Sequence, residues 1–329
     1  MDQITGTQTR LAGFTESAYN TTPGAPDGQL LYVVSDGLTA TAQTVKDETL
    51  AGYRGQLRPV RDLRDVSGQN VVNIAPQSIG FWLKHALGAP TTTGTGPYTH
   101  TFQVALSGAN ALPVGLLLER DLGAAFTAAS RYLRFSGGKI ARAQFQFGPG
   151  GFAKATFDVK GANMTSSSTA LDATLTDNGH TAFANQVGTL TVDAGASTLC
   201  GPAFTLTVDN DLDDGNYCIG AGGVRGSLPH GFAMVSGTID TLLKDDTLLL
   251  KQINDTDIGF VYALTNGTGL GTAGNESLTF TIPQAALALT APQIQNSKGL
   301  RLQGNWDAYR SAGAELGVTV VLKNMVSAY

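Results

Sequence analysis

The sequence predicts a mainly β protein of the α+β class, built from two tandem units that each carry one α-helix. Three observations support this prediction. The chain contains 41 Gly and 12 Pro in 329 residues, a level that favours strands and turns over long helices. Some segments alternate strictly between apolar and polar residues, which is the period of a half-buried strand. Short sequence matches also recur in the same order in the two halves of the chain.

The charge content narrows the class of protein. Charged residues make up 14% of the chain and hydrophobic residues 42%, whereas an average soluble protein carries about 25% charged residues. A surface this poor in charge is expected to be covered in part by contacts with other copies. The net charge of −5 argues against a protein that binds nucleic acid by neutralising phosphates. The apolar runs are too short to span a membrane, and the start of the chain predicts no export signal.

The first 28 residues are interpreted as an extended N-terminal arm, because they are polar and rich in turn residues such as Pro23 and Gly24. A strand is expected at residues 29–34. Two long connections, residues 46–64 and 209–223, interrupt units whose other loops are short. Connections of this length are uncommon unless they are functional.

One helix is predicted in each unit. The first lies between Pro76, which suits a first helical turn, and Gly88, which suits the position after the last turn. Its apolar stripe at helical spacing consists of Ile79, Trp82, Leu83, Ala86 and Leu87. The second helix is predicted over residues 245–254, with Asp245 as a possible N-cap. Its apolar face would consist of Leu249, Leu250 and Ile253.

Matched segments predict that the chain is a duplication. The segments Leu38-Thr39-Ala40-Thr41, Arg54-Gly55-Gln56-Leu57 and Val66-Ser67-Gly68 recur as Phe204-Thr205-Leu206-Thr207, Arg225-Gly226-Ser227-Leu228 and Val235-Ser236-Gly237. Their offsets are 166, 171 and 169 residues, so the spacing is nearly constant. Parts of residues 151–164 similarly match parts of 313–325.

A half-buried hairpin is expected at the end of each unit. In the first, Ala141, Ala143, Phe145 and Phe147 alternate with polar residues, and the turn at 148–151 leads into an alternating return strand over 153–160. In the second, strands at 300–303 and 315–323 are expected to pair in the same way. The predicted divisions are an arm at 1–28, a first unit at 29–164, a linker at 165–186 and a second unit at 187–329.

Patterns that would indicate catalysis, a cofactor or a metal are weak, so no catalytic residue, cofactor or metal ligand is predicted. His85, His100, His180 and His230 are scattered, and a structural role is favoured for His85. The string Gly269-Leu270-Gly271-Thr272-Ala273-Gly274 precedes an expected strand, whereas a dinucleotide site needs a helix there. The acidic run at 209–214 lacks the spacing of a calcium loop. Cys200 and Cys218 are expected to be reduced, although a disulfide stays open.

The order of these features resembles the tail tube (major tail) proteins of long-tailed bacteriophages. The resemblance rests on the arm Glu16-Ser17-Ala18-Tyr19-Asn20-Thr21-Thr22-Pro23, the strand at 29–34, Arg54-Gly55, and Val66-Ser67-Gly68 leading into residues 75–88. The segment Pro97-Tyr98-Thr99-His100-Thr101-Phe102 adds to it. The resemblance implies β-barrel or sandwich units, each flanked by one helix. The inner sheets of these units would join side by side around a lumen. A duplicated chain would then form homotrimeric rings with pseudo-sixfold symmetry.

The resemblance also implies partners and a place of action. The rings would stack into a tube in the virion tail and conduct DNA during ejection without binding it specifically. A tape-measure protein and the tail terminator and distal tail proteins would be further partners. Contacts between rings would come from the arm and the long loops, and the candidates are Tyr19, Tyr53, Arg54, Tyr217 and Arg225. Deletion of residues 1–20 is therefore expected to leave a folded protein that no longer polymerises.

Some alternatives stay open at this point. A carbohydrate-binding or adhesin module of two β-sandwiches would use exposed aromatic residues such as Trp306 or Tyr309 against sugars. A tube subunit of a contractile tail is a close relative of the first interpretation, and the sequence does not exclude it. The face of the sheet that would line the lumen is not predicted, because the hairpin faces carry both basic and acidic residues.

Overall fold

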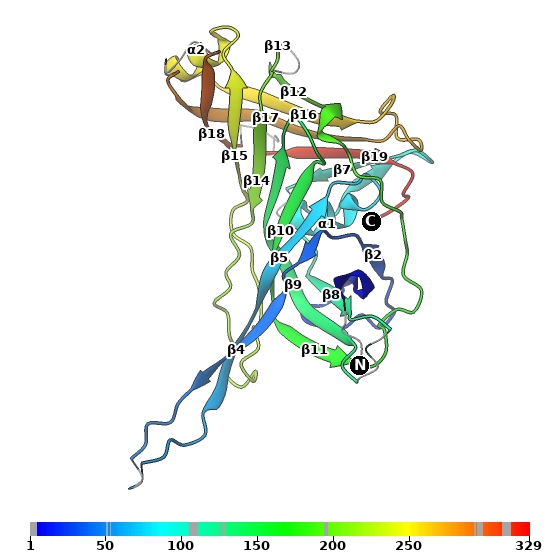
Figure 1. The fold of residues 1–329 in the computed structure, drawn as a ribbon, viewed down its shortest axis with the longest axis vertical. Coiled ribbons are helices and arrows are strands. Elements are labelled where there is room, and N and C mark those ends of the chain that lie inside the picture. Colours follow the sequence, from blue (N-terminus) through cyan, green and yellow to red (C-terminus); the bar gives the residue numbers. More distant parts are fainter. Residues whose placement is uncertain are drawn as a thin grey trace.

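Figure 1 shows the computed structural model, which describes residues 5–50, 52, 54–104, 111–124, 126, 129–193, 197–292, 294, 299–310 and 317–329. The fold is mainly β, with antiparallel strands and two short α-helices in the described part of the chain. The helices are α1 (Ile79–Leu87) and α2 (Thr247–Ile253). The strands are β1 (Arg10–Glu16), β2 (Gln29–Leu31), β3 (Ser35–Asp36), β4 (Thr39–Val45), β5 (Val60–Asn73), β6 (Thr91–Thr93), β7 (Tyr98–Gln103), β8 (Gly115–Asp121), β9 (Tyr132–Phe147), β10 (Lys154–Gly161), β11 (Asn163–Ser167), β12 (Gly188–Val192), β13 (Ser197–Thr198), β14 (Ala203–Asp209), β15 (Met234–Leu242), β16 (Ile258–Thr265), β17 (Ser277–Thr290), β18 (Arg301–Ala308) and β19 (Thr319–Asn324).

The hairpin predicted in the first half is present as β9 and β10. Phe157 of β10 lies opposite Ala143 of β9, and both side chains are fully buried. The alternation differs from the prediction at one point. The register shifts between Asp158 and Val159, so Ile140 takes a buried position that the sequence pattern assigned to Ala141. An extra residue in one strand of an antiparallel pair has this effect.

Strand β9 takes part in two layers of the first half. Its first part pairs with β8 and β11, and its second part pairs with β10. The first layer continues from β8 to β1 and β2, and the second continues from β10 to β5 and β4. Helix α1 packs into the core, where Trp82 stacks on Phe157 at 4.8 Å between ring centroids.

The same order of pairing is found again in the second half. Strand β17 pairs with β16 and β19 through its first part and with β18 through its last part. One layer continues from β16 to β12 and β13, and the other from β18 to β15 and β14. A register shift also recurs, between Leu116 and Leu118 in the β8–β9 pair and between Ile258 and Phe260 in the β16–β17 pair.

Two strand pairs connect the halves. The second part of β9 pairs with β14, a contact called the internal joint below. Because of it, β4, β5, β10, β9, β14, β15, β18 and β17 follow one another in a continuous sheet. Strand β7 pairs with β19, and Tyr329 reaches the segment just before α1, where its Oη donates to the carbonyl of Gln77 at 3.0 Å. The halves therefore share one core.

Both predicted helices are present. Helix α1 ends before Gly88, whose φ of 132° lies in the region that favours glycine. Helix α2 begins after Asp246, and the carboxylate of Asp245 accepts the backbone N–H of Thr247 at 3.1 Å. Its predicted apolar face is wrong, because Leu248 is buried while Leu250 and Ile253 are exposed. The helix has only two turns, so a shift of one residue in the packed position escapes the periodic pattern.

The prediction of an N-terminal arm is wrong for residues 10–16, which form β1. This strand pairs with β2 on one side and with β8 on the other. Leu11 packs in the main core, and Phe14 packs with Leu171 and Leu175. A strand buried on both faces shows no alternation, and the polar residues that follow it made the whole segment resemble an arm.

The hairpin predicted for the second half is also wrong. Strand β18 pairs with β15 and β17, whereas β19 pairs with β17 and β7. Both strands alternate because each buries one face, but alternation does not specify the partner strand. In the predicted linker, residues 165–167 belong to β11 and Phe183 is fully buried.

The repeated Val-Ser-Gly segments have a packing reason. A Cβ atom on Gly68 would collide with the carbonyl oxygen of Gly37, and one on Gly237 would collide with that of Thr205. In both halves, glycine therefore lets the preceding strand approach closely. No helix in the described ranges is long and apolar enough to cross a membrane.

Candidate functional site

The hairpin of β4 and β5 projects far beyond the rest of the fold (Figure 1, lower left). Its apolar side chains face solvent: Leu50 is 98% exposed, and Val45 and Val60 are more than half exposed. Arg54, one of the predicted contact residues, is exposed near the tip. Tyr53, another, lies outside the described residues. Exposed apolar side chains at the tip of an extended hairpin are typical of a surface that contacts another protein.

The second long connection, residues 210–233, joins β14 to β15 and lies against the base of the hairpin. The backbone N–H of Arg64 in β5 donates to the carbonyl of Gly223 at 2.8 Å. The loop carries its own bridge pairs, Leu212 with His230 and Tyr217 with Arg225. Ile219 is fully exposed and Phe232 is 89% exposed. This loop therefore presents exposed apolar side chains, and its part around Gly223 lies beside the base of the hairpin.

Arg225 holds this loop against the sheet. Its side chain is 3% exposed. Its Nε donates to the carbonyl of Asp214 at 2.7 Å, Nη1 donates to the carbonyl of Gly161, and Nη2 donates to Asp65 Oδ1 at 2.9 Å and to Tyr217 Oη at 3.1 Å. The hydroxyl of Tyr217 donates in turn to the carbonyl of Arg64 at 2.9 Å. Arg225 thus makes its contacts inside its own subunit, and we call it and its partners the Arg225 cluster.

Tyr19 and Glu16 border this cluster. The hydroxyl of Tyr19 is buried and lacks a hydrogen-bond partner among the described residues, and burial raises the pKa of Tyr19 to about 12. The Glu16 side chain accepts the backbone N–H groups of Gly137 and Asn20, each at 2.9 Å. The structure therefore brings three predicted contact residues together, Tyr19, Tyr217 and Arg225, and leaves Arg54 apart from them at the hairpin tip.

Glu16 makes the stability of the chain sensitive to pH. Burial raises its pKa from 4.5 to about 7, and this effect outweighs the hydrogen bonds from the backbone N–H groups of Gly137 and Asn20, which lower the pKa. At pH values between 4.5 and about 7, Glu16 keeps its proton in the folded chain and releases it in the unfolded chain. The free energy of unfolding therefore falls as pH rises, by at most about 1.4 kcal/mol per pH unit.

Glu16→Gln is expected to remove this slope, because the amide does not titrate. Gln offers a single acceptor oxygen for the two amides, so the variant loses about 1 kcal/mol at low pH. Urea unfolding of both proteins across this pH window measures the difference, which should shrink and then change sign as pH rises, because the wild type loses up to about 3 kcal/mol over the window. A constant difference would contradict the raised pKa of Glu16.

The continuous sheet has one face on the core and one polar face. Two arginines on the polar face form ion pairs across strands, Arg142 with Asp209 at 3.0 Å and Arg301 with Asp240 at 3.1 Å. Lys154 lies exposed on the same face. Glutamine, threonine and serine side chains such as Gln144, Thr207 and Ser236 occupy positions between them. The polar face is thus hydrophilic, and these two arginines have acidic partners on the neighbouring strands.

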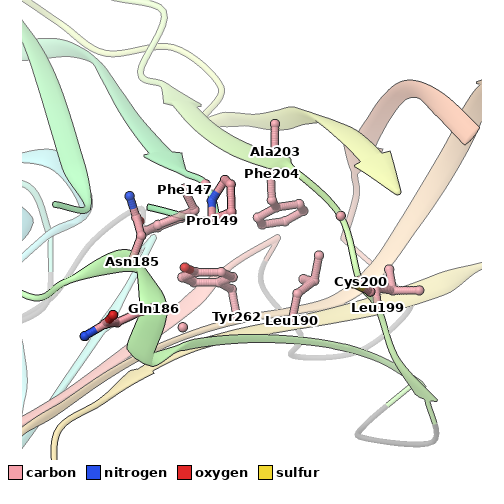
Figure 2. Close-up of a pocket in the computed structure, with 13 residues that line it drawn as sticks. Phe147, Pro149, Asn185, Gln186, Leu190, Leu199, Cys200, Ala203, Phe204 and Tyr262 are labelled. Atoms are coloured by element: carbon pink, nitrogen blue, oxygen red, sulfur yellow. The ribbon is translucent and has the colours of Figure 1, made fainter. Parts of the chain in front are cut away.

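Figure 2 shows a cleft of about 240 Å³ near the end of the internal joint. Phe147 and Tyr262 stack there at 3.9 Å between ring centroids, and Phe204 lies beside them. Asn185 donates to the carbonyl of Gly150 at 2.9 Å. Burial raises the pKa of Tyr262 to about 12, so its hydroxyl is neutral at pH 7. These side chains pack strands of the two halves together and offer no charged group for chemistry.

The histidine and acidic residues that were considered for catalysis or metal binding make structural contacts. His85 is buried and its Nε2 lies 3.2 Å from Thr15 Oγ1. In the acidic run, Asp209 pairs with Arg142 and Asp214 with Lys160. No group of three or more His, Cys, Asp or Glu side chains that could hold a metal ion is found among the residues described. Cys200 and Cys218 are exposed free thiols.

The aromatic residues proposed for sugar binding do not form such a site. Trp306 is completely buried, where it stacks on Phe204 at 5.6 Å between ring centroids. Tyr309 is only partly exposed, and the carboxylate of Asp257 accepts its hydroxyl. The adhesin interpretation thus loses Trp306, one of the two aromatic side chains that it named.

Two residues that the sequence interpretation missed lie at sheet edges. Asn210 is buried at the internal joint, where its Nδ2 donates at 2.9 Å to the carbonyls of Ala86 and Ile140. Gln252 of α2 donates from Nε2 to the carbonyl of Leu289 at 2.9 Å. Asparagine and glutamine are common in loops and helices, so only the position of these two side chains beside a strand edge shows that they bind backbone carbonyls there.

Comparison with protein families gives one match over nearly the whole chain. The model of a family described as phage tail tube protein matches residues 6–308. A search of curated proteins finds no match to the chain.

Proposed function

Because the chain belongs to the phage tail tube protein family, we propose that it forms homotrimeric, pseudo-hexameric rings that stack into the tail tube of a long-tailed phage. The family itself identifies a structural virion protein that assembles into a tube. The observation that carries the finer proposal is the recurrence of the strand-pairing order within one chain. Three copies of a chain with two such units would supply six units to a ring.

The two units of the proposal are the β-barrel or sandwich domains at residues 29–164 and 187–329, joined by residues 165–186. The repeated register shifts and the repeated glycine contacts support a duplication. Since β1 belongs to the first core, the first unit is extended to include residues 10–16.

The polar face of the continuous sheet is proposed to line the lumen. Its opposite face is already covered by the core. DNA has to pass without being retained, so basic side chains on the wall need acidic partners. The cross-strand ion pairs Arg142–Asp209 and Arg301–Asp240 meet this requirement for the two arginines.

The hairpin tip and the loop of residues 210–233 are proposed to contact the adjacent ring. Leu50, Ile219 and Phe232 are almost fully exposed there, and burying them between rings would favour stacking. Arg225 and Tyr217 act within the subunit by holding the loop in place, while Arg54 is placed to contact the next ring directly. A tape-measure protein, tail terminator and distal tail proteins are proposed as further partners.

Electron microscopy of the purified chain tests this function. The protein is concentrated, incubated and examined for end-on views. Hollow rings or tubes with threefold or pseudo-sixfold symmetry are expected. Compact oligomers without a lumen, found at every concentration, would contradict the proposal.

Leu50→Ser combined with Ile219→Ser is expected to weaken stacking without affecting the fold. Both side chains are exposed, so the free energy of unfolding should change by less than about 0.5 kcal/mol. Tubes should become shorter or give way to single rings in electron micrographs. Leu50→Met with Ile219→Met keeps the apolar surface and should preserve tube length. Long tubes from the serine variant would exclude these side chains from the ring contact.

A further inference from the structure

Gln252 caps a carbonyl at the edge of the continuous sheet. Leu289 lies opposite Gly304 of β18, but its carbonyl accepts Nε2 of Gln252 at 2.9 Å. A strand residue directs its N–H and C=O to the same side, so the backbone of Leu289 faces away from β18. Among the described strands, none other than β18 pairs with residues 286–290. A side chain therefore covers what would be the next hydrogen-bonding position of the sheet.

We propose that residues 286–290 of β17 are an assembly edge for β4 of a second copy of this chain, and that Gln252 covers this edge until the second copy displaces it. This inference rests on the proposed tube function and adds the paired strands, their register and the group that leaves.

The internal joint provides the template for this contact. Ala40 lies opposite Val66 of β5, and Val208 lies opposite Val235 of β15. The repeated pairing therefore makes Ala40 the counterpart of Val208, two residues beyond Leu206, with which the sequence match had aligned it. Val66 and Val235 lie opposite Gly161 of β10 and Ala308 of β18. Four residues earlier in these strands, Phe157 lies opposite Ala143 and Gly304 lies opposite Leu289. Leu289 is therefore the counterpart of Ala143. Val208 and Ala143 lie opposite each other in the internal joint. Ala40 of one copy is therefore expected opposite Leu289 of the next.

This register pairs Thr39 with Thr290 and Thr41 with Ala288. The ladder is expected to begin after Leu38, because the N–H of Leu38 donates to Asp36 at 3.1 Å and its carbonyl accepts Arg120 at 2.9 Å. The two edges of the sheet differ from each other, so copies join head to tail, as in a closed ring.

The expected contact lacks the side-chain bonds of the internal joint. Arg142 and Asp209 form an ion pair across the internal joint, at the positions that Ala288 and Thr41 occupy in the contact between copies. Asn210, with its two bonds to backbone carbonyls, corresponds to Ala42. The contact between copies thus consists mostly of backbone hydrogen bonds. A cap that occupies one of these carbonyls therefore competes with a sizeable part of the contact.

The capped arrangement is also easy to displace. Oε1 of Gln252 is buried and has no hydrogen-bond partner among the described residues, and an unsatisfied buried acceptor is unfavourable. Arrival of β4 would give Leu289 a backbone partner and return Gln252 to water. The cap therefore protects the edge in the free subunit without preventing assembly.

Gln252→Leu tests the cap. The variant keeps an apolar contact of similar size but exposes the Leu289 carbonyl in the free chain, so the critical concentration for tube formation should fall. The fall should be at most about fivefold, the equivalent of one net hydrogen bond, because relief of the unpaired Oε1 offsets part of the cost of breaking the cap. Light scattering and sedimentation measure it. Lys251→Met is the matched control, because it breaks another polar anchor of α2, in which Lys251 contacts Asp193 at 3.0 Å and the carbonyl of Asp257 at 2.6 Å, and leaves the cap in place. An unchanged critical concentration for Gln252→Leu, or an equal fall for Lys251→Met, overturns the cap.

Cysteine pairs test the register. In a chain with Cys200→Ser and Cys218→Ser, Thr39→Cys combined with Thr290→Cys should give disulfide-linked chains after oxidation of assembled protein, since opposite Cβ atoms in such a pair lie about 5 Å apart. Thr41→Cys with Thr290→Cys, displaced by two residues, should cross-link far less. Stronger cross-linking of the displaced pair, or tubes without any cross-link, overturns the assembly edge and leaves the tube function intact. A wild-type chain that never forms rings overturns the function and this inference with it.

Discussion

Replacing Arg225 with Met is expected to lower the free energy of unfolding by about 3 kcal/mol and to release the loop of residues 210–233. The guanidinium bonds to Asp214, Gly161, Asp65 and Tyr217, and Met replaces none of these bonds. Asp65 remains partly exposed, so water compensates part of the loss. Urea unfolding measures the stability, and limited proteolysis of the loop measures its release. Tubes should fail to form, because Ile219 and Phe232 would no longer be held in position.

Arg54→Met is the matched control, because it makes the same chemical change at the exposed hairpin tip. Its free energy of unfolding should stay within about 0.5 kcal/mol of the wild type, so any loss of tubes would come from the ring contact itself. Arg225→Lys keeps the charge but loses the planar fork of donors and should retain little of the stability. A stable Arg225→Met variant with a protected loop would show that Arg225 does not anchor it.

Deletion of residues 1–20 is expected to prevent folding, contrary to the expectation from sequence alone. The deletion removes β1, whose Leu11 and Phe14 are buried and which lies between β2 and β8. Each such side chain contributes about 1.5–3 kcal/mol when fully buried. With the lost strand pairing, the total approaches the whole stability of a typical domain, about 5–15 kcal/mol. Circular dichroism and expression in soluble form measure the outcome.

Deletion of residues 1–9 distinguishes the effect of losing β1 from the effect of losing the segment before it. This shorter deletion leaves β1 intact and removes residues that are largely exposed where described, so the chain should fold with nearly wild-type stability. A folded, soluble protein from the deletion of residues 1–20 would show that β1 is dispensable.

The features that could be predicted from sequence are those that local patterns encode. The alternation in β9 and β10 predicted a half-buried hairpin, and the spacing of Trp82 and Leu83 between Pro76 and Gly88 predicted α1. These patterns are informative because burial of one face imposes a period on neighbouring residues. The order of such features along the chain was also sufficient to indicate the family that the whole-chain match shows.

Prediction of the candidate site was less complete. Both long connections were identified as unusual segments, but residues 60–64 of the first belong to β5 and the second extends from 210 to 233. Arg54 lies at an exposed tip. The matching Arg-Gly segments suggested equal roles for Arg54 and Arg225, yet Arg225 is buried among backbone carbonyls. Exposure of a charged side chain depends on what folds over it, and two identical short segments can differ completely in this respect.

The sequence by itself determined the class of structure, the first helix, the half-buried hairpin and the family, because each depends on composition or on the order of nearby residues. Only the tertiary structure decided that β1 belongs to the core, that β18 and β19 have other partners than each other, and that Gln252 covers the edge at Leu289. These outcomes depend on contacts between residues far apart in the chain. A strand's own residues specify which face is buried, whereas its partner is selected by the packing of the whole fold.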